Sequence, residues 1–171
     1  MATFSGVICE VSDETAFYAK AAPLGIRKVR DAKGIITIDT SAAFTDPSEK
    51  LARELSTFDC VKRAFAIFGQ SAADGYVVAE NVRGETVRHV LYNRDEGGWQ
   101  TTGTPRPWEK DIPVGKKRDV PDDEDENDAD RMTYRKLMTL VQNLGWDFDA
   151  GPHAKHQRPS LLARLFGTSL F

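Results

Sequence analysis

The feature that most constrains the fold is a stretch of alternating apolar and polar residues between Cys60 and Trp108. An alternation of period two is typical of half-buried strands. Four such runs follow one another, over residues 61–68, 75–82, 85–93 and 99–102. The connections at 83–84 and 94–98 are short and contain glycine, so consecutive strands are expected to pair as antiparallel neighbours. The sequence therefore predicts an antiparallel meander in the middle of the chain.

Two further strands and two main helices are expected outside this meander. Residues 3–11 and 34–39 carry apolar, β-branched patterns that predict strands. Residues 46–57 begin with an N-cap aspartate, a first-turn proline and a glutamate three residues after the cap, which together predict a helix start. A second helix is predicted over 130–144 from apolar residues at helical spacing: Tyr134, Leu137, Met138, Val141 and Leu144.

These elements predict an α+β fold made of an antiparallel meander sheet of four to six strands. The helices over 46–57 and 130–144 are expected to pack on one face of the sheet, and an acidic loop and a short C-terminal helix complete the fold. The length of 171 residues suggests one domain with a tail. We expect a sheet domain over 1–114, a charged flexible linker over 115–130, a helical segment over 131–150 that packs back on the sheet, and a basic tail with a short amphipathic helix over 151–171.

Charge is distributed unevenly along the chain. Residues 119–130 contain eight acids and no base, whereas the net charge of the whole chain is -3, so the other 159 residues carry a net +5. Dense like charge with almost nothing apolar to bury predicts a solvated linker. A second hypothesis is that these carboxylates attract a basic partner and so raise the rate at which it associates.

Several classes of protein are excluded or disfavoured. No run approaches 18 apolar residues, so no transmembrane segment is expected, and residues 1–10 do not resemble a secretory signal. The two cysteines, Cys9 and Cys60, are too few for a disulfide framework and are expected to be reduced thiols of a cytoplasmic protein. The common nucleotide, hydrolase and zinc motifs are absent. We therefore expect no cofactor and favour a protein that is not an enzyme.

Two patterns that resemble metal sites are incomplete. His153 and His156 have a spacing that two ligands could use, but no cysteine lies near them and zinc needs three or four protein ligands. A calcium loop starting at Asp123 would have Asp128 where the loop needs glycine and Tyr134 where it needs glutamate. We predict no metal site and expect the two histidines to lie in a solvated tail.

Aromatic and charged residues near the end of the meander are the best candidates for a partner-binding site. Trp, Tyr and Arg dominate binding energy in protein interfaces. The candidate residues are Tyr92, Arg94, Trp99, Arg106 and Trp108, together with Asp122, Asp123, Glu124, Asp125 and Glu126 from the acidic segment. We expect a non-enzymatic binding protein of the bacterial cytoplasmic type that acts through a protein–protein surface and neutralises a toxin, as immunity proteins do, or inhibits another protein.

Three alternatives stay open at this point. The first is an enzyme whose proton carriers are His89, Glu80 and Asp95. The second is a DNA mimic that uses the acidic segment, and the third is an accessory subunit that docks through the tail helix. Nucleic-acid binding by the body of the chain is not expected, because its basic residues are scattered and the densest cluster, residues 27–33, is small. The sequence leaves the oligomeric state open.

Overall fold

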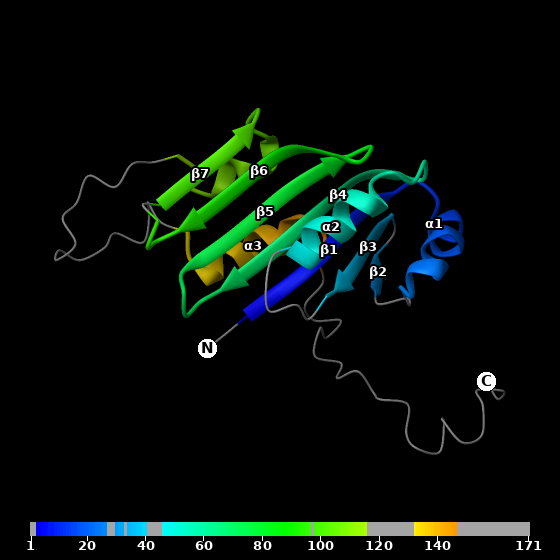
Figure 1. Cartoon of the computed structure of the whole chain (residues 1–171), viewed down its shortest axis with the longest axis horizontal. Coiled ribbons are helices and arrows are strands. Elements are labelled where there is room, and N and C mark those ends of the chain that lie inside the picture. The colour runs from blue at the N-terminus through cyan, green and yellow to red at the C-terminus, as the bar shows by residue number, and fades with distance from the viewer. Residues whose placement is uncertain are drawn as a thin grey trace, which may run out of the picture.

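A computed structural model describes residues 3–26, 30–32, 34–40, 46–96, 98–115 and 132–146 of the chain (Figure 1). These residues form one antiparallel sheet with a helix on each of its two faces. The expectations for the acidic segment 119–130, for His153 and His156, and for the tail 151–171 fall on residues outside this set.

The sheet has seven strands in the order β2-β3-β1-β4-β5-β6-β7. The strands are β1 (Thr3–Val11), β2 (Arg30–Ala32), β3 (Ile35–Asp39), β4 (Val61–Gln70), β5 (Gly75–Val82), β6 (Glu85–Asn93) and β7 (Gly98–Gly103). The predicted α+β fold is confirmed, and β4 to β7 form the expected meander. The sheet exceeds the expected four to six strands because β2 is a three-residue strand, Arg-Asp-Ala, without an apolar pattern.

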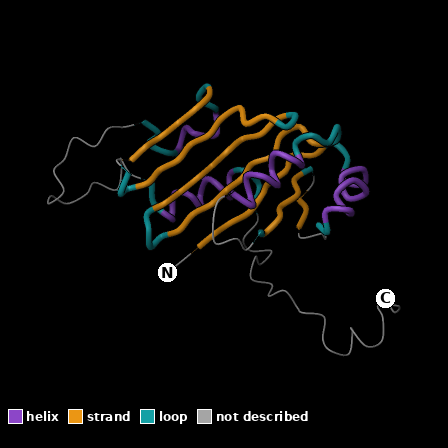
Figure 2. The backbone as a smooth tube through the Cα atoms, in the orientation of Figure 1, coloured by secondary structure: helices purple, strands orange, loops and turns teal. Residues whose placement is uncertain are grey.

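The two main helices cover opposite faces of the sheet, so the prediction that both pack on one face is wrong (Figures 1 and 2). α2 (Asp46–Leu55) packs Leu55 into a core with Val7 and Cys9, on what we call the α2 face. α3 (Tyr134–Asn143) packs Leu137 into a core with Ile8, on what we call the α3 face. The reason is that β1 and β4 are buried over consecutive residues, so both faces of these central strands are apolar and both need a cover.

Three short helices complete the described structure. α1 (Glu14–Ala21) begins at Asp13, whose carboxylate accepts a hydrogen bond from the backbone N–H of Ala16 at 2.9 Å, and it places Phe17 in the core of the α2 face. The 3-10 helix η1 (Ala22–Leu24) follows it directly. The 3-10 helix η2 (Pro107–Asp111) follows β7 and packs Trp108 against the α3 face. Among the described residues, no helix is both long enough and apolar enough to cross a membrane.

Candidate functional site

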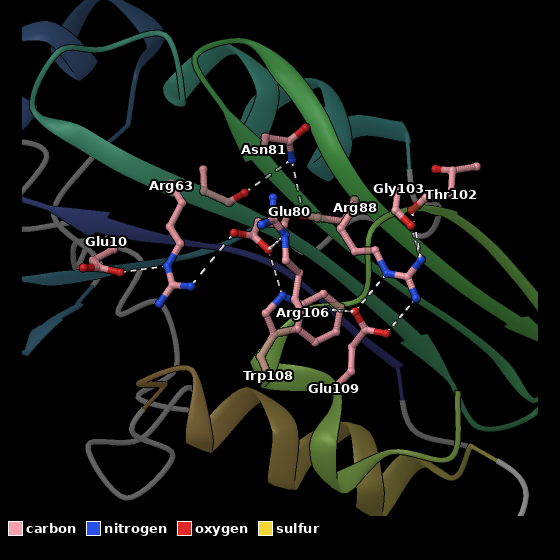
Figure 3. Close-up of polar contacts among 12 residues, drawn as sticks. Glu10, Arg63, Glu80, Asn81, Arg88, Thr102, Gly103, Arg106, Trp108 and Glu109 are labelled. Carbon is pink, nitrogen blue, oxygen red and sulfur yellow. Dashed lines mark hydrogen bonds and ion pairs between the residues drawn. The ribbon is translucent and has the colours of Figure 1, made fainter. Parts of the chain in front are cut away.

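A row of alternating charges crosses the α3 face of the sheet (Figure 3). It consists of Glu10 on β1, Arg63 on β4, Glu80 on β5 and Arg88 on β6, and the strand registers pair Glu10 with Arg63 and Glu80 with Arg88. Arg63 Nε donates to Glu10 Oε2 at 2.8 Å, and Arg63 Nη1 lies 3.9 Å from Glu80 Oε1. Opposite charges at facing cross-strand positions attract each other, so the row is electrostatically self-consistent.

An irregularity in the β5–β6 hairpin brings Arg88 into this row. Both residues of the turn at 83–84 have positive φ, 52° and 85°, as a tight hairpin turn requires. Counting outward from this two-residue turn, a regular ladder would place Val87 opposite Glu80. The register shifts between Glu80 and Asn81, and Arg88 stands opposite Glu80 instead. The bulge thus provides a buried carboxylate with a facing arginine.

The helix η2 adds a second layer of polar side chains over the row (Figure 3). Trp108 Nε1 donates to Glu80 Oε2 at 2.8 Å, and Arg106 Nε lies 3.4 Å from the same oxygen. Arg88 Nε and Nη2 donate to the two carboxylate oxygens of Glu109 at 2.9 and 2.6 Å. Glu109 also accepts from the backbone N–H of Arg106 at 2.6 Å. We call this set the charged cluster: Glu10, Arg63, Glu80, Arg88, Arg106, Trp108 and Glu109.

The charged cluster is buried at one end and exposed at the other. The Arg88 and Glu109 side chains are only 3% and 8% exposed, and Arg88 Nη1 also donates to the carbonyl oxygens of Thr102 and Gly103. By contrast, the side chains of Arg63 and Arg106 are 42% and 36% exposed. A bidentate buried pair of this kind has a defined geometry. It therefore anchors η2 against the sheet, and the two partly exposed guanidinium groups lie on a fixed support.

The exposed end of the cluster carries an excess of positive charge. Glu10 accepts hydrogen bonds from both Arg63 and Lys62, the latter at 3.3 Å. Partial burial raises the pKa of Glu10, but these hydrogen bonds outweigh burial, so its pKa lies below the usual value and the side chain stays ionised at neutral pH. Glu80 is buried, whereas Lys62, Arg63 and Arg106 are partly or largely exposed. Of the described carboxylates that pair with them, Glu10 is the one that is partly exposed.

The residues expected to act together in an enzyme are not brought together. His89 pairs with Ala79 and lies on the α2 face, where its Nε2 is 3.3 Å from Glu49 Oε1 on α2. Glu80 lies one residue from Ala79 along β5 and therefore points to the opposite face. Asp95 is exposed in the β6–β7 turn. The hydrogen bond from His89 lowers the pKa of Glu49, which indicates a stabilising pair at the sheet–helix contact.

The structure separates the residues expected to bind a partner. Tyr92 and Trp99 pack together on the α3 face with ring centroids 4.9 Å apart, and Tyr92 is buried. Arg94 lies in the β6–β7 turn, with its Nη1 3.6 Å from Asp74 Oδ2. Arg106 and Trp108 belong to the charged cluster. The acidic candidates Asp122, Asp123, Glu124, Asp125 and Glu126 lie outside the described residues.

Sequence reasoning missed most of the charged cluster, although a signal for it exists. Glu80 lies two residues after Val78 and four after Tyr76, so it shares a strand face with these buried residues. Arg88 lies two residues before the buried Val90 and shares its face. A charged residue on the apolar register of a strand requires a buried partner. That mismatch marks Glu80 and Arg88, whereas nothing in the pattern marks Arg63 or Glu109.

Neither cysteine belongs to the charged cluster. Within the described ranges, no group of three or more histidine, cysteine, aspartate or glutamate side chains is arranged to hold a metal ion. Cys9 and Cys60 are buried, unpaired thiols in the core of the α2 face. Burial raises the pKa of Cys9, so this thiol is protonated and weakly nucleophilic at neutral pH.

Comparison with known proteins gives no match: no family model, no curated protein and no solved structure matches this chain.

Proposed function

We propose that this chain is a non-enzymatic protein-binding protein and that the exposed end of the charged cluster is its contact surface. The observation that carries the proposal is the arrangement of Arg63 and Arg106. Both side chains are partly exposed, and both are directed at the buried carboxylate of Glu80. Arginine is enriched among the residues that dominate the energy of protein interfaces, so a supported pair of arginines favours a binding role.

The support under these arginines favours binding because it limits the entropy that association costs. Immobilising a flexible side chain costs about 0.5–1.5 kcal/mol when a partner binds. Arg63 already donates to Glu10, and its guanidinium group lies 5.3 Å from the centroid of the Phe65 ring. Arg106 is next to η2, which the Arg88–Glu109 pair holds against the sheet. Part of this cost is therefore met before the partner arrives.

The charge of the exposed end indicates the chemistry of the partner. Among the described residues that these ion pairs join, Lys62, Arg63 and Arg106 face solvent and Glu10 is the partly exposed carboxylate, so a complementary surface presents carboxylates. Within this class of function, we keep the narrower hypothesis that the chain neutralises a toxin or inhibits another protein. Affinity capture that identifies the partner also tests this narrower hypothesis.

The test is quantitative affinity capture from the source organism with three baits. The wild-type chain is compared with an Arg63→Ala/Arg106→Ala variant and with a control, Arg53→Ala, which removes an exposed arginine on α2. We expect one protein to be enriched by the wild-type and Arg53→Ala baits and lost with the double variant. The recombinant partner should then bind the wild-type chain with an affinity that falls as salt rises. Equal capture by all three baits would contradict the proposal.

A further inference from the structure

Within the described ranges, the outer edge of β7 has no strand paired with it. β7 is the last strand of the sheet, and it pairs with β6 through six residue pairs from Gly98 to Gly103. In the described part of the chain, no strand pairs with its other side (Figure 1). The sequence of β7, GWQTTG, contains neither a charge nor a proline, and its last four residues are exposed. The outward N–H and C=O groups of such a strand are a template for another strand.

The opposite edge of the sheet, β2, differs from β7 in its length and in its charge. β2 has three residues, Arg-Asp-Ala, and two of them are charged. Short length and charged residues are two of the features by which edge strands avoid pairing with other chains. Because β7 is twice as long as β2 and uncharged, it is the edge suited to association.

We propose that β7 pairs in antiparallel orientation with β7 of a second copy of this chain, which joins the two sheets into one continuous sheet. A twofold axis perpendicular to the sheet at Gln100 places Gln100 opposite its own counterpart and Trp99 opposite Thr101 of the second copy. Trp99 lies on the α3 face, and Thr101 alternates onto the same face. An aromatic residue facing a β-branched residue is a favourable cross-strand pair, and this register forms that pair twice.

We choose a second copy of this chain as the partner of β7 because the strand can pair with its own sequence. A strand without charge meets no like-charge repulsion when it pairs with its own sequence, whereas a charged edge would. The contact is small. It involves five β7 residues of each chain, Gly98 to Thr102, compared with about 20–30 residues a side in a standard interface, so we expect a dimer that dissociates on dilution. This inference does not depend on the proposed function, because the charged cluster and the β7 edge use different residues.

Sedimentation velocity of the purified full chain from micromolar to millimolar concentration tests the proposal. We expect the weight-average mass of the wild-type chain to rise toward twice the monomer mass. In the Gln100→Lys and Gln100→Glu variants, like charges face each other across the axis, and we expect each to dimerise at least about tenfold more weakly. An equimolar mixture of the two variants places opposite charges together, so the mixture should recover dimerisation.

The control is Gln142→Lys, the same substitution on the exposed surface of α3, and it should dimerise like the wild-type chain. A wild-type chain that stays monomeric at millimolar concentration overturns the proposal and leaves the β7 edge for a strand of another protein. A mixture that fails to recover dimerisation overturns it as well, and so does an equal loss in the Gln142→Lys control. None of these results bears on the capture experiment with the Arg63 and Arg106 variants.

Discussion

The substitution Glu109→Gln tests whether a buried ion pair supports the charged cluster. It leaves the guanidinium group of Arg88, which is 3% exposed, buried without the carboxylate that binds two of its nitrogens. Removing one partner of a buried ion pair costs about 3–5 kcal/mol of folding free energy. Arg88 Nη1 keeps its hydrogen bonds to the carbonyl oxygens of Thr102 and Gly103, at 3.1 and 2.9 Å. We therefore expect the folding free energy to fall by an amount near the lower end of this range, about 3 kcal/mol.

The assay is equilibrium unfolding in urea, followed by far-UV circular dichroism. With an m value of about 2 kcal/mol/M, a loss of about 3 kcal/mol lowers the urea midpoint by about 1.5 M. The control is Glu10→Gln, which removes a partly exposed carboxylate from an ion pair at the solvent end of the cluster. Such pairs contribute less than about 1 kcal/mol, so the midpoint should fall by less than about 0.5 M.

Two results would refute this account of the anchor. One is a fall of the midpoint in Glu109→Gln no larger than in Glu10→Gln. The other concerns the double variant Arg88→Met/Glu109→Met, which removes both charges and leaves apolar side chains of similar length. Because no charge is left buried alone, the double variant should be more stable than Glu109→Gln. Equal or lower stability would show that something other than the unpaired charge is responsible.

Three further predictions follow from other parts of the molecule. The lowered pKa of Glu49 stabilises the fold above pH 4.5, and this contribution is lost as the pH falls through the folded-state value. In urea titrations, Glu49→Gln should therefore be less stable than the wild-type chain at neutral pH and should approach it in acid. Gly69→Ala places a methyl group onto Leu137 Cδ2 and should cost about 1–3 kcal/mol in the same assay, and the double variant Gly69→Ala/Leu137→Ala should lose less stability than the sum of the two single losses. Cys9 should react with a thiol reagent at the rate of unfolding, because burial covers its sulfur and raises its pKa; a rapid reaction in the folded chain would contradict its placement.

The strands of the meander could be predicted because local sequence determines them. Alternation identifies which residues share a face. The glycine at 84 predicts a tight turn at 83–84, and both turn residues have positive φ in the structure. The separation of His89 from Val90 onto different faces follows from the same rule. These features depend on neighbours within a few residues of one another.

The placement of the helices could not be predicted from helix patterns alone. The apolar stripes of α2 and α3 show that each helix covers a sheet face, but they do not say which one. The deciding information lies in β1 and β4, where Val7, Ile8 and Cys9 are all buried, as are Ala64 to Phe68. In the sequence, these residues form continuous apolar runs, which are typical of strands covered on both faces. Such runs predict one helix on each face of the sheet.

The alternation marks Glu80 and Arg88 as charged residues on an apolar register, but their partners could not be predicted because the cluster depends on contacts between distant segments. A bulge moves Arg88 opposite Glu80, and no residue in the hairpin announces it. The partner of Arg88 is Glu109, which comes from η2 after β7, and the sequence separation of 21 residues gives no pairing signal. Trp108 was expected as a partner-binding candidate, whereas its indole N–H is directed into the cluster toward Glu80.

Site-specific photo-crosslinking tests whether the exposed end of the charged cluster contacts a protein partner. A photoreactive phenylalanine analogue is placed at Lys62 or Lys110, both of which are exposed and adjoin the cluster, and at Lys50 on α2 as the control. We expect a covalent adduct with one protein from both cluster positions and none from Lys50. An adduct from Lys50 alone, or none from either cluster position while capture still succeeds, would contradict the claim.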